Sequence, residues 1–446
     1  MKRQNWVYIV VICVYVFYVE SHGQSSLLRS GPMVGYSQMR EVMLWVQTTT
    51  EAQVKIKYWE KNNVSRSWYT EEVTTSKIDG YTAKLLADSV QPGKIYSYEL
   101  YINGKPEKIP HRLEFQSQKL WQHREDPPDF KVALGSCAFI NDSIYDRPGK
   151  PYGGGYSIFN SILSKKPDMM LWLGDNIYLR EADWGSRTGF IYRYTHARSL
   201  PELQPLLGSV HHYALWDDHD YGPNDADRSF IHKSIALECF MLFWANPTFG
   251  FYDIPCATTM FEWGDVHFFL LDNRYFRAPN NSITGDRSYL GRAQLQWLVE
   301  ALKYSKAPFK MVAIGGQTIN PLQVYENYSN YKEERDTLLS LISKENISGV
   351  FFLSGDRHHT ILTKLERKNQ YPLYDLTVSP LTSSPPRKEE FSEKSEFMVA
   401  NTLVLERNFA VLEFSGKRKE RQMKISVYNV DGKILWEKTI KESELK

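Results

Sequence analysis

Short runs in which hydrophobic and polar residues alternate fill the first quarter of the chain. They occupy residues 42–46, 54–59 and 95–100. Turn dipeptides separate the runs, at Asp79-Gly80, Pro92-Gly93 and Asn103-Gly104. A period of two is typical of strands that bury one face, so this part predicts a small antiparallel β-sandwich over residues 25–118. The segment contains no cluster of His, Cys and carboxylate residues, and we therefore expect it to pack against or position the rest of the protein.

After residues 126–129 the pattern changes, and continuous hydrophobic runs alternate with stretches of helical periodicity. The expected strands cover residues 130–134, 169–173, 213–216, 266–271, 311–314 and 350–353. The expected helices cover residues 156–165, 230–244, 291–304 and 333–343. Alternation returns in three runs near the end of the chain, at residues 409–414, 423–428 and 434–439. This order predicts an α/β domain over residues 129–446 that closes with β-hairpins.

Composition and charge narrow the choice of function. With 446 residues, of which 42% are hydrophobic, the chain is too long for one domain. Its 54 Lys and Arg residues nearly balance 52 Asp and Glu residues, giving a formal charge of +2. Because no basic excess remains to neutralise a phosphate backbone, we expect no dedicated nucleic-acid binding.

The amino terminus resembles an export signal. Lys2 and Arg3 precede an uncharged run over residues 6–19, and Ser21-His22-Gly23 supplies small residues for cleavage. The run is shorter than the about 20 residues of a comfortable membrane span. We therefore expect residues 1–23 to be a signal peptide and the mature chain to be exported, to the periplasm or the medium. An uncleaved membrane anchor is the alternative, since bulky aromatic residues make this run atypical.

Cysteine usage excludes a disulfide framework. Of the four cysteines, Cys13 lies in the expected signal peptide. The remaining three, Cys137, Cys239 and Cys256, are an odd number, so at least one is unpaired or used in chemistry. Cys239 and Cys256 lie in apolar sequence, which favours the core or an incidental disulfide for both.

Polar clusters follow directly after four of the expected strands. They are Gly135-Ser136-Cys137, Gly174-Asp175-Asn176-Ile177-Tyr178, Asp217-Asp218-His219-Asp220 and Gly355-Asp356-Arg357-His358-His359. In open α/β sheets ligands bind beyond the carboxyl ends of the strands, so we expect these clusters to converge. Carboxylates, a thiolate, a phenolate and imidazoles can together hold two cations, one hard and one softer or ferric. Two ions about 3.5–4 Å apart generate a hydroxide and stabilise an in-line phosphoryl displacement, which indicates phosphoester hydrolysis.

Three further segments accompany these clusters: Trp216, Leu271-Asp272-Asn273-Arg274 and the opening Gly31-Pro32-Met33-Val34-Gly35. Taken in order, the clusters and these segments resemble the alkaline phosphatase D (PhoD-like) family of metallophosphoesterases, which is related to purple acid phosphatases. The resemblance implies a four-layer α/β/β/α core preceded by a fibronectin-like antiparallel β-sandwich. It also implies a metal-dependent hydrolase of phosphodiesters or phosphomonoesters, with two or more metal ions that include iron and calcium.

The resemblance implies roles for individual residues. Cys137 stands as an unusual iron ligand, Asp175 as the bridging carboxylate and Tyr178 as a phenolate ligand. Asp218 takes the place of a ligating asparagine, His219 lies near the scissile phosphate, and the late ligands are Asp356 and His358. Three positions depart from the family: Asp220 stands for Glu, Asn176 for an aromatic residue, and Gly316-Gln317 for Asn-Gln. These departures concern the substrate and the calcium site more than the fold.

The residues themselves add further expectations. On an extended backbone the side chains of Asp217 and Asp218 diverge, so only one of them points at the metals. The resemblance implies that this is Asp218, which leaves Asp217 in a supporting position. Asp356 and His358, two residues apart on a strand extension, face the same side. Arg274, just past a strand, suits bidentate phosphate binding. The glycine-rich segment 152–156 lacks the lysine of a P-loop and is expected only to permit a helix start.

Each candidate also has a purely structural interpretation, and two rival functions stay open. Cys137 is alternatively a small buried hydrophobe, Asp175 a turn cap and Tyr178 a packed core residue. The first rival is a non-catalytic, metal-stabilised cell-surface binding protein, and the second is a phosphomonoesterase of sugar or lipid phosphates. The expected partner is a small-molecule or polymeric phosphate ester, and the oligomeric state is left open.

Overall fold

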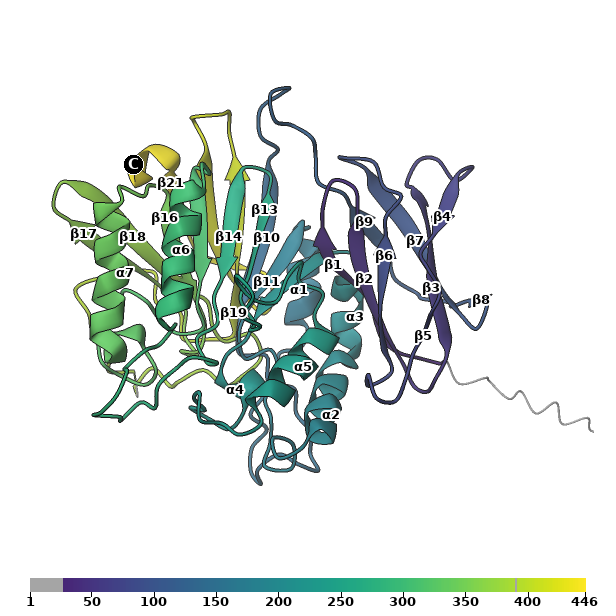
Figure 1. Cartoon of the computed structure of the whole chain (residues 1–446), viewed down its shortest axis with the longest axis horizontal. Coiled ribbons are helices and arrows are strands. Elements are labelled where there is room, and N and C mark those ends of the chain that lie inside the picture. The colour runs from purple at the N-terminus through teal and green to yellow at the C-terminus, as the bar shows by residue number, and fades with distance from the viewer. Residues whose placement is uncertain (1–26, 390) are drawn as a thin grey trace, which may run out of the picture.

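The computed structural model describes residues 27–389 and 391–446. The expected β-sandwich is present at the amino-terminal end (Figure 1). One layer contains β1 (Leu28–Ser37), β2 (Val42–Thr48) and β6 (Thr82–Ala87). The other contains β3 (Gln53–Glu60), β4 (Ser67–Tyr69), β5 (Val73–Thr74), β7 (Ile95–Ile102), β8 (Lys105–Pro106) and β9 (Glu114–Gln116). Alternate residues of both layers, such as Leu44, Ile56 and Tyr98, form a hydrophobic core between them, as the period of two predicts.

Two larger sheets make up the rest of the molecule. The first has nine strands in the order β21-β20-β19-β10-β11-β12-β1-β2-β6. Its new members are β10 (Phe130–Gly135), β11 (Met169–Leu173), β12 (His211–Leu215), β19 (Asn408–Ser415), β20 (Gln422–Asn429) and β21 (Ile434–Lys441). The second has six strands in the order β13-β14-β15-β16-β18-β17. They are β13 (Thr259–Trp263), β14 (Val266–Leu270), β15 (Phe309–Ala313), β16 (Val350–Ser354), β17 (Ile361–Arg367) and β18 (Gln370–Thr377).

The two sheets pack face to face, and helices cover their outer sides (Figure 1). The nine-stranded sheet carries α1 (Ile158–Ser164), α2 (Arg187–Arg198), α3 (Gln204–Leu207) and α5 (Lys233–Phe243). The six-stranded sheet carries α6 (Arg292–Tyr304) and α7 (Lys332–Lys344). Shorter helical turns are η1 (Pro201–Leu203), α4 (Asp218–Tyr221), η2 (Tyr328–Tyr331) and η3 (Glu442–Leu445). This arrangement confirms the four-layer α/β/β/α core preceded by a β-sandwich.

The sandwich shares a sheet with the α/β domain. Strand β1 pairs in parallel with β12, with Val34 opposite His211, so the first sandwich layer extends the nine-stranded sheet. From β2, Trp45 packs in the core under the helices, and its indole Nε1 donates a hydrogen bond of 2.8 Å to the carbonyl of Leu242. The two expected domains are therefore joined by backbone hydrogen bonds and a common core.

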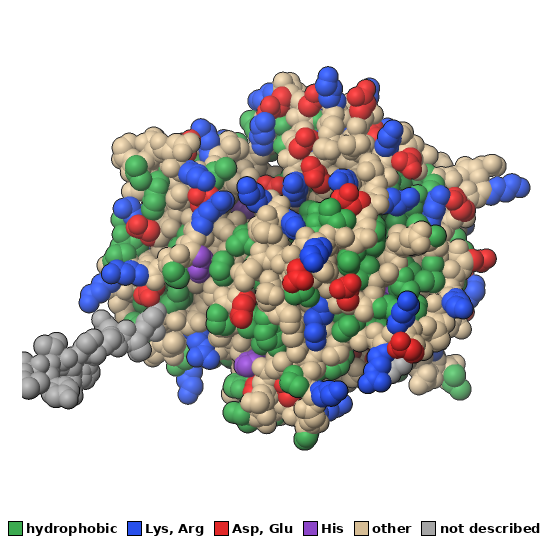
Figure 2. Space-filling model, turned by 180° about the vertical axis from the view of Figure 1, so that it is seen from behind, with side chains coloured by type: hydrophobic (Ala, Val, Ile, Leu, Met, Phe, Trp, Pro, Cys, Tyr) green, Lys and Arg blue, Asp and Glu red, His purple; other side chains and the backbone are tan. Residues whose placement is uncertain are grey.

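Surface charge agrees with the near-zero net charge. On the face drawn in Figure 2, basic and acidic side chains are interspersed. No helix of the described residues is long and apolar enough to cross a membrane. The expected signal peptide, residues 1–23, lies outside the described residues. Cys137, Cys239 and Cys256 are all buried and free, so the disulfide considered for the last two is not formed.

His211 lies at the joint between the sandwich and the nine-stranded sheet and makes stability sensitive to acid. Its Nδ1 donates to the carbonyl of Gly35 at 2.8 Å, and its Nε2 accepts from the backbone N–H of Gln116 at 3.1 Å. Burial lowers the pKa of His211 to about 4. An unfolded histidine titrates near 6.5, so the folded state binds fewer protons between these values. Its contribution is complete above pH about 6.5 and is lost as the pH falls towards 4.

We therefore expect the free energy of unfolding to fall between pH 6.5 and 4. His211 accounts for up to about 1.4 kcal/mol of this loss per pH unit. In His211→Gln the protein is less stable at pH 7.5, but its slope in this window is flatter by that amount. Urea unfolding at several pH values measures both effects, and the exposed His123→Gln is the matched control. An unchanged slope in His211→Gln would contradict the assignment.

Candidate functional site

The predicted motifs converge beyond the carboxyl ends of β10, β11, β12 and β16. Four of the expected ligands adopt left-handed backbone conformations, with φ of 58° at Cys137, 52° at Asp175, 63° at Asp356 and 52° at His358. This region is disfavoured for residues other than glycine, and such residues gather at functional sites. The strand ends therefore turn sharply to bring their polar side chains together.

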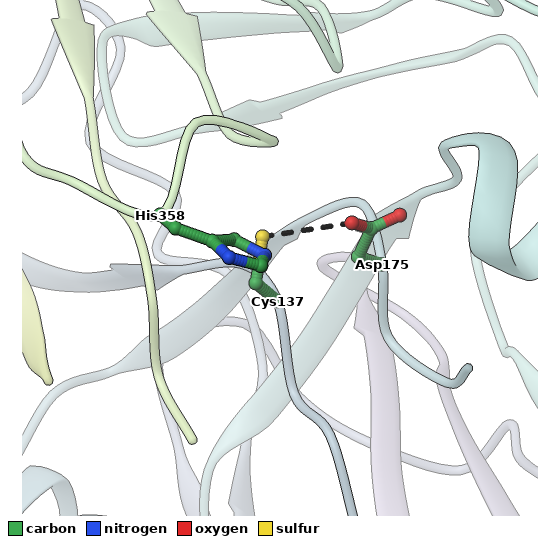
Figure 3. A group of neighbouring side chains, drawn as sticks. All are labelled: Cys137, Asp175 and His358. Carbon is green, nitrogen blue, oxygen red and sulfur yellow. Dashed lines mark hydrogen bonds between the residues drawn. The ribbon is translucent and has the colours of Figure 1, made fainter. Parts of the chain in front are cut away.

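The first group of ligand atoms contains Cys137, Asp175 and His358 (Figure 3). Their ligand atoms all lie within 4.8 Å of one another, and the Cys137 Sγ is 3.5 Å from the Asp175 Oδ2. The hydroxyl of Tyr178 lies 3.2 Å from the same carboxylate oxygen and 3.1 Å from the His358 Nε2. These four side chains supply thiol, carboxylate, phenol and imidazole groups to one small volume.

A second group lies on the other side of Asp175. The ligand atoms of Asp175, Asp218 and His219 lie within 4.8 Å of one another. Those of Asp217, Asp218 and Asp356 also lie within 4.8 Å of one another, and because both sets contain Asp218, together they are called the second group. Asp175 therefore takes part in both groups, and Asp218 links the second group to Asp356. This position would allow the Asp175 carboxylate to contact a cation in each group.

Asp217 and Asp218 do not diverge as an extended backbone would predict. Helix α4 begins at Asp218 with Asp217 as its N-cap, so the chain turns and both carboxylates reach the group around Asp356. The Asp217 Oδ1 accepts hydrogen bonds from the Asn273 Nδ2 at 2.8 Å and the Arg274 Nε at 2.5 Å. A side chain at Gly315 would collide with the Asp217 carboxylate, which explains a glycine at this position.

Arg274 does not face a substrate, contrary to the sequence-based expectation. Its side chain is fully buried, and its Nη2 pairs with Asp217 and, at 2.5 Å, with the Glu326 Oε2. The loop after β14 turns inward because the Asp272 Oδ1 accepts the backbone N–H groups of Arg274 and Tyr275, each at 2.9 Å. The guanidinium is therefore engaged by protein carboxylates and holds Asp217 in place.

Asp356 and His358 also differ from the expectation that they face the same side. Left-handed residues replace the expected strand extension after β16, and the two side chains reach different groups. Asp356 joins Asp217 and Asp218, whereas His358 joins Cys137 and Asp175. The one loop therefore supplies both ends of the site.

His219 lies at the edge of the second group. Its ring packs on Tyr178 with a centroid distance of 4.2 Å, its Nε2 lies 3.9 Å from the Asp218 Oδ2, and its side chain is 23% exposed. Burial lowers the pKa of His219, and the Asp218 carboxylate opposes this shift. His359 is buried against Phe391, and its Nδ1 lies 2.9 Å from the Arg357 carbonyl oxygen, so its contacts are structural.

Two departures from the family pattern support each other. Asp220 accepts hydrogen bonds from the backbone N–H groups of Asn176, at 3.1 Å, and Asp217, at 3.0 Å. The Asn176 amide in turn donates to the carbonyl of Leu215 at 2.8 Å. This pair ties the loop after β11 to the loop after β12.

The electrostatics of the site fit bound cations. Burial raises the pKa of Asp175 well above its usual value, and Asp218 and Asp217 raise it further. Burial, followed by Asp175, likewise raises the pKa values of Cys137 and Tyr178. The Asp217 Oδ2 and the Asp218 Oδ1 are buried without a hydrogen-bond partner among the described residues. Buried carboxylate oxygens without a partner are costly, and metal ions bound beside them would remove that cost.

The structure adds residues that the sequence pattern did not reveal. Glu326 and Asp225 place carboxylate oxygens near Asp218. Tyr152 lies 3.1 Å from the His358 Nδ1. Arg357 pairs with Glu393 and lies over the ring of Tyr325 at 4.0 Å, while its Nε and Nη1 have no hydrogen-bond partner among the described residues. Glu326 lies in an irregular loop without a recognisable motif. Tyr152 lies in the glycine-rich segment 152–156, a segment expected only to permit a helix start.

The fold and part of the sequence are similar to those of known proteins. Residues 257–425 match the family described as PhoD-like phosphatase, and residues 25–120 match a domain of unknown function, DUF7800. The solved structure of PhoD is 16% identical, covers 94% of this chain and 91% of its own, and has a TM-score of 0.77. A purple acid phosphatase, PPD1 from yellow lupin (Lupinus luteus), is 12% identical, with 92% and 74% covered and a TM-score of 0.65.

No curated protein sequence is significantly similar to this chain. The two structural matches agree in fold over nearly its whole length, and the family match lies within the catalytic domain. The clustered carboxylate, thiol and imidazole groups of the site can hold metal ions. Residues 257–425 are therefore similar to the PhoD-like phosphatase family, the whole chain has the fold of PhoD and of a purple acid phosphatase, and together these findings support a phosphoesterase.

Proposed function

We propose that the protein hydrolyses phosphate esters at a site of two or more metal ions. Cys137, Asp175, Tyr178 and His358 would hold one ion, and Asp175, Asp218 and Asp356 a second. The observation that carries the proposal is the sharing of Asp175 by both groups of ligand atoms. A thiolate and a phenolate favour a ferric or softer ion, and a set of carboxylates favours a hard cation such as calcium.

Each part of the site has a proposed task. Bound cations would supply Lewis acidity that polarises the phosphoryl oxygens. Asp175 sets the spacing between the two groups, and Arg274, through Asp217, fixes the carboxylates of the second. His219, partly exposed beside Asp218, would contact a phosphate oxygen or protonate the leaving group. The ring of Tyr178 packs against the His219 ring and holds its orientation.

The complete ligand set disfavours the rival of a non-catalytic, metal-stabilised binding protein. A protein that had lost catalysis would be free to lose ligands, whereas all six expected ligands lie in or beside the two groups. The choice between diesters and monoesters depends on loops that admit or exclude the second ester group, so a monoesterase of sugar or lipid phosphates stays an alternative.

Metal analysis combined with two model substrates tests the proposal. We expect at least two metal ions per chain and metal-dependent release of nitrophenol from bis(p-nitrophenyl) phosphate, p-nitrophenyl phosphate or both. The ratio of the two rates assigns the ester class. Stoichiometric metal without turnover on either substrate would favour the binding protein.

We also propose that the chain is exported. The support is the basic Lys2-Arg3 pair followed by an uncharged run over residues 6–19 and the small residues at positions 21 and 23. Cell fractionation followed by amino-terminal sequencing tests this proposal and separates a cleaved signal from a retained anchor. We expect the mature chain to begin near Gln24.

Cys137 should be necessary for one of the bound ions. Cys137→Ala removes the thiolate from the first group, so we expect the loss of one metal ion per chain and of most activity. Cys239→Ala is a matched control, because Cys239 is an equally buried free thiol in the core under the helices. Elemental analysis of both variants gives the stoichiometry. Full metal content in Cys137→Ala would make Cys137 a structural residue.

A further inference from the structure

Two tyrosine hydroxyls hold the imidazole of His358 from opposite edges. The Tyr178 hydroxyl lies 3.1 Å from Nε2, and the Tyr152 hydroxyl lies 3.1 Å from Nδ1. The Tyr178 hydroxyl is also 3.2 Å from the Asp175 Oδ2, so Nε2 faces the first group of ligand atoms. Nδ1 therefore faces outwards, towards the glycine-rich segment that carries Tyr152.

The chemistry of histidine decides which group donates in the hydrogen bond between the His358 Nδ1 and the Tyr152 hydroxyl. A neutral imidazole carries one proton, and a cation binds only the nitrogen that lacks it. If Nε2 binds a cation, the proton is on Nδ1, which then donates to the Tyr152 oxygen. We propose that Tyr152 is a positioning residue that fixes the tautomer and the ring orientation of His358 for metal binding. This inference rests on the proposed metal site and extends it.

The surroundings of Tyr152 keep its hydroxyl in place. Its ring packs edge-on against Phe139 at a centroid distance of 4.9 Å. Its carbonyl oxygen accepts hydrogen bonds from the Ser384 Oγ, at 2.7 Å, and the Arg407 Nη2, at 3.3 Å. The next residue, Gly153, donates its N–H to the Asn141 Oδ1 at 2.8 Å. The backbone at Tyr152 is thus anchored independently of the hydroxyl, as a positioning residue requires.

Tyr152→Phe tests this role because it removes the hydroxyl and keeps the ring packing. Partners of this kind typically change metal affinity about 10–100-fold. We expect the affinity for Zn²⁺, used as the probe in competition with a chelator, to fall by that factor at the site that His358→Ala weakens. Tyr145→Phe is the matched control, since Tyr145 is 41% exposed, Tyr152 is 40% exposed, and Tyr145 packs on Tyr192 away from His358.

A double-mutant cycle completes the test. In a His358→Ala background, Tyr152→Phe should change the Zn²⁺ affinity no further, because its effect acts through the imidazole. Equal Zn²⁺ affinity in Tyr152→Phe and Tyr145→Phe would overturn the inference. The inference would also be overturned if Tyr152→Phe still lowered the Zn²⁺ affinity in the His358→Ala background. The measurement of Zn²⁺ binding does not depend on turnover. If the protein hydrolysed no ester, the proposed function would be refuted, and the Zn²⁺ affinities would still decide the role of Tyr152.

Discussion

Asp175→Asn is expected to lower phosphate ester hydrolysis by several orders of magnitude while the fold stays intact. The carboxylate lies between the two groups of ligand atoms, so it both binds the ions and sets their separation. Asparagine has nearly the same shape and can still accept the hydrogen bond that the backbone N–H of His219 donates to Oδ1 at 3.4 Å. The loss should therefore come from metal binding and spacing. Steady-state rates with both nitrophenyl substrates and metal analysis measure these effects.

A matched control separates this effect from the loss of a carboxylate elsewhere. Asp168 accepts hydrogen bonds from the Lys131 backbone N–H and the Gln116 side chain, at the amino ends of the strands and away from the site. We expect Asp168→Asn to lower stability without changing the activity per folded molecule. If Asp175→Asn kept its activity within tenfold of the parent at equal metal content, the bridging role would be wrong.

His219→Ala is expected to keep the full metal content and to lose turnover. General acid catalysis is typically worth about 10²–10⁴-fold. An activated nitrophenol leaving group needs no proton, whereas an alkyl alcohol does. The variant should therefore lose much more activity on an alkyl phosphate ester than on the nitrophenyl ester of the same class. Parallel kinetics on the two esters measure the difference.

Two other results would change the role of His219. Loss of one metal ion would make His219 a ligand, in agreement with its place in the group of Asp175 and Asp218. An equal loss on both esters would mean that the imidazole positions the phosphate. His123→Ala, which changes an exposed histidine outside the groups of ligand atoms, should leave both rates unchanged.

Several elements could be predicted from the local pattern alone. Strand β11 (Met169–Leu173) matches its predicted range, and α6 and α7 agree to within one residue at each end. These segments bury nearly continuous or regularly spaced apolar residues, so their pattern directly reflects burial. Helix α2 was not predicted, because its buried face includes Arg193 and Arg198. Buried arginines that pair with distant groups leave no hydrophobic periodicity to detect.

Which polar residues belong to the site could also be predicted in large part. Cys137, Asp175, Asp218 and His358 follow strands at their carboxyl ends, where an α/β sheet gathers its ligands, and the structure brings them together. That rule needs only the order of strands and the chemistry of the residues after them. The position of each side chain within the site needs more, because it depends on the turn that follows the strand.

The tertiary structure alone decided three matters. The pairing of β1 with β12 joins the sandwich to the catalytic sheet, although the two strands are far apart in sequence. Arg274 turns inward because Asp217 and Glu326, from other loops, neutralise it. Tyr152 reaches His358 across 206 positions of sequence. The sequence by itself determined the elements and the residues at strand ends, because both depend on near neighbours. Partners, orientations and buried ion pairs depend on segments that meet only when the chain folds.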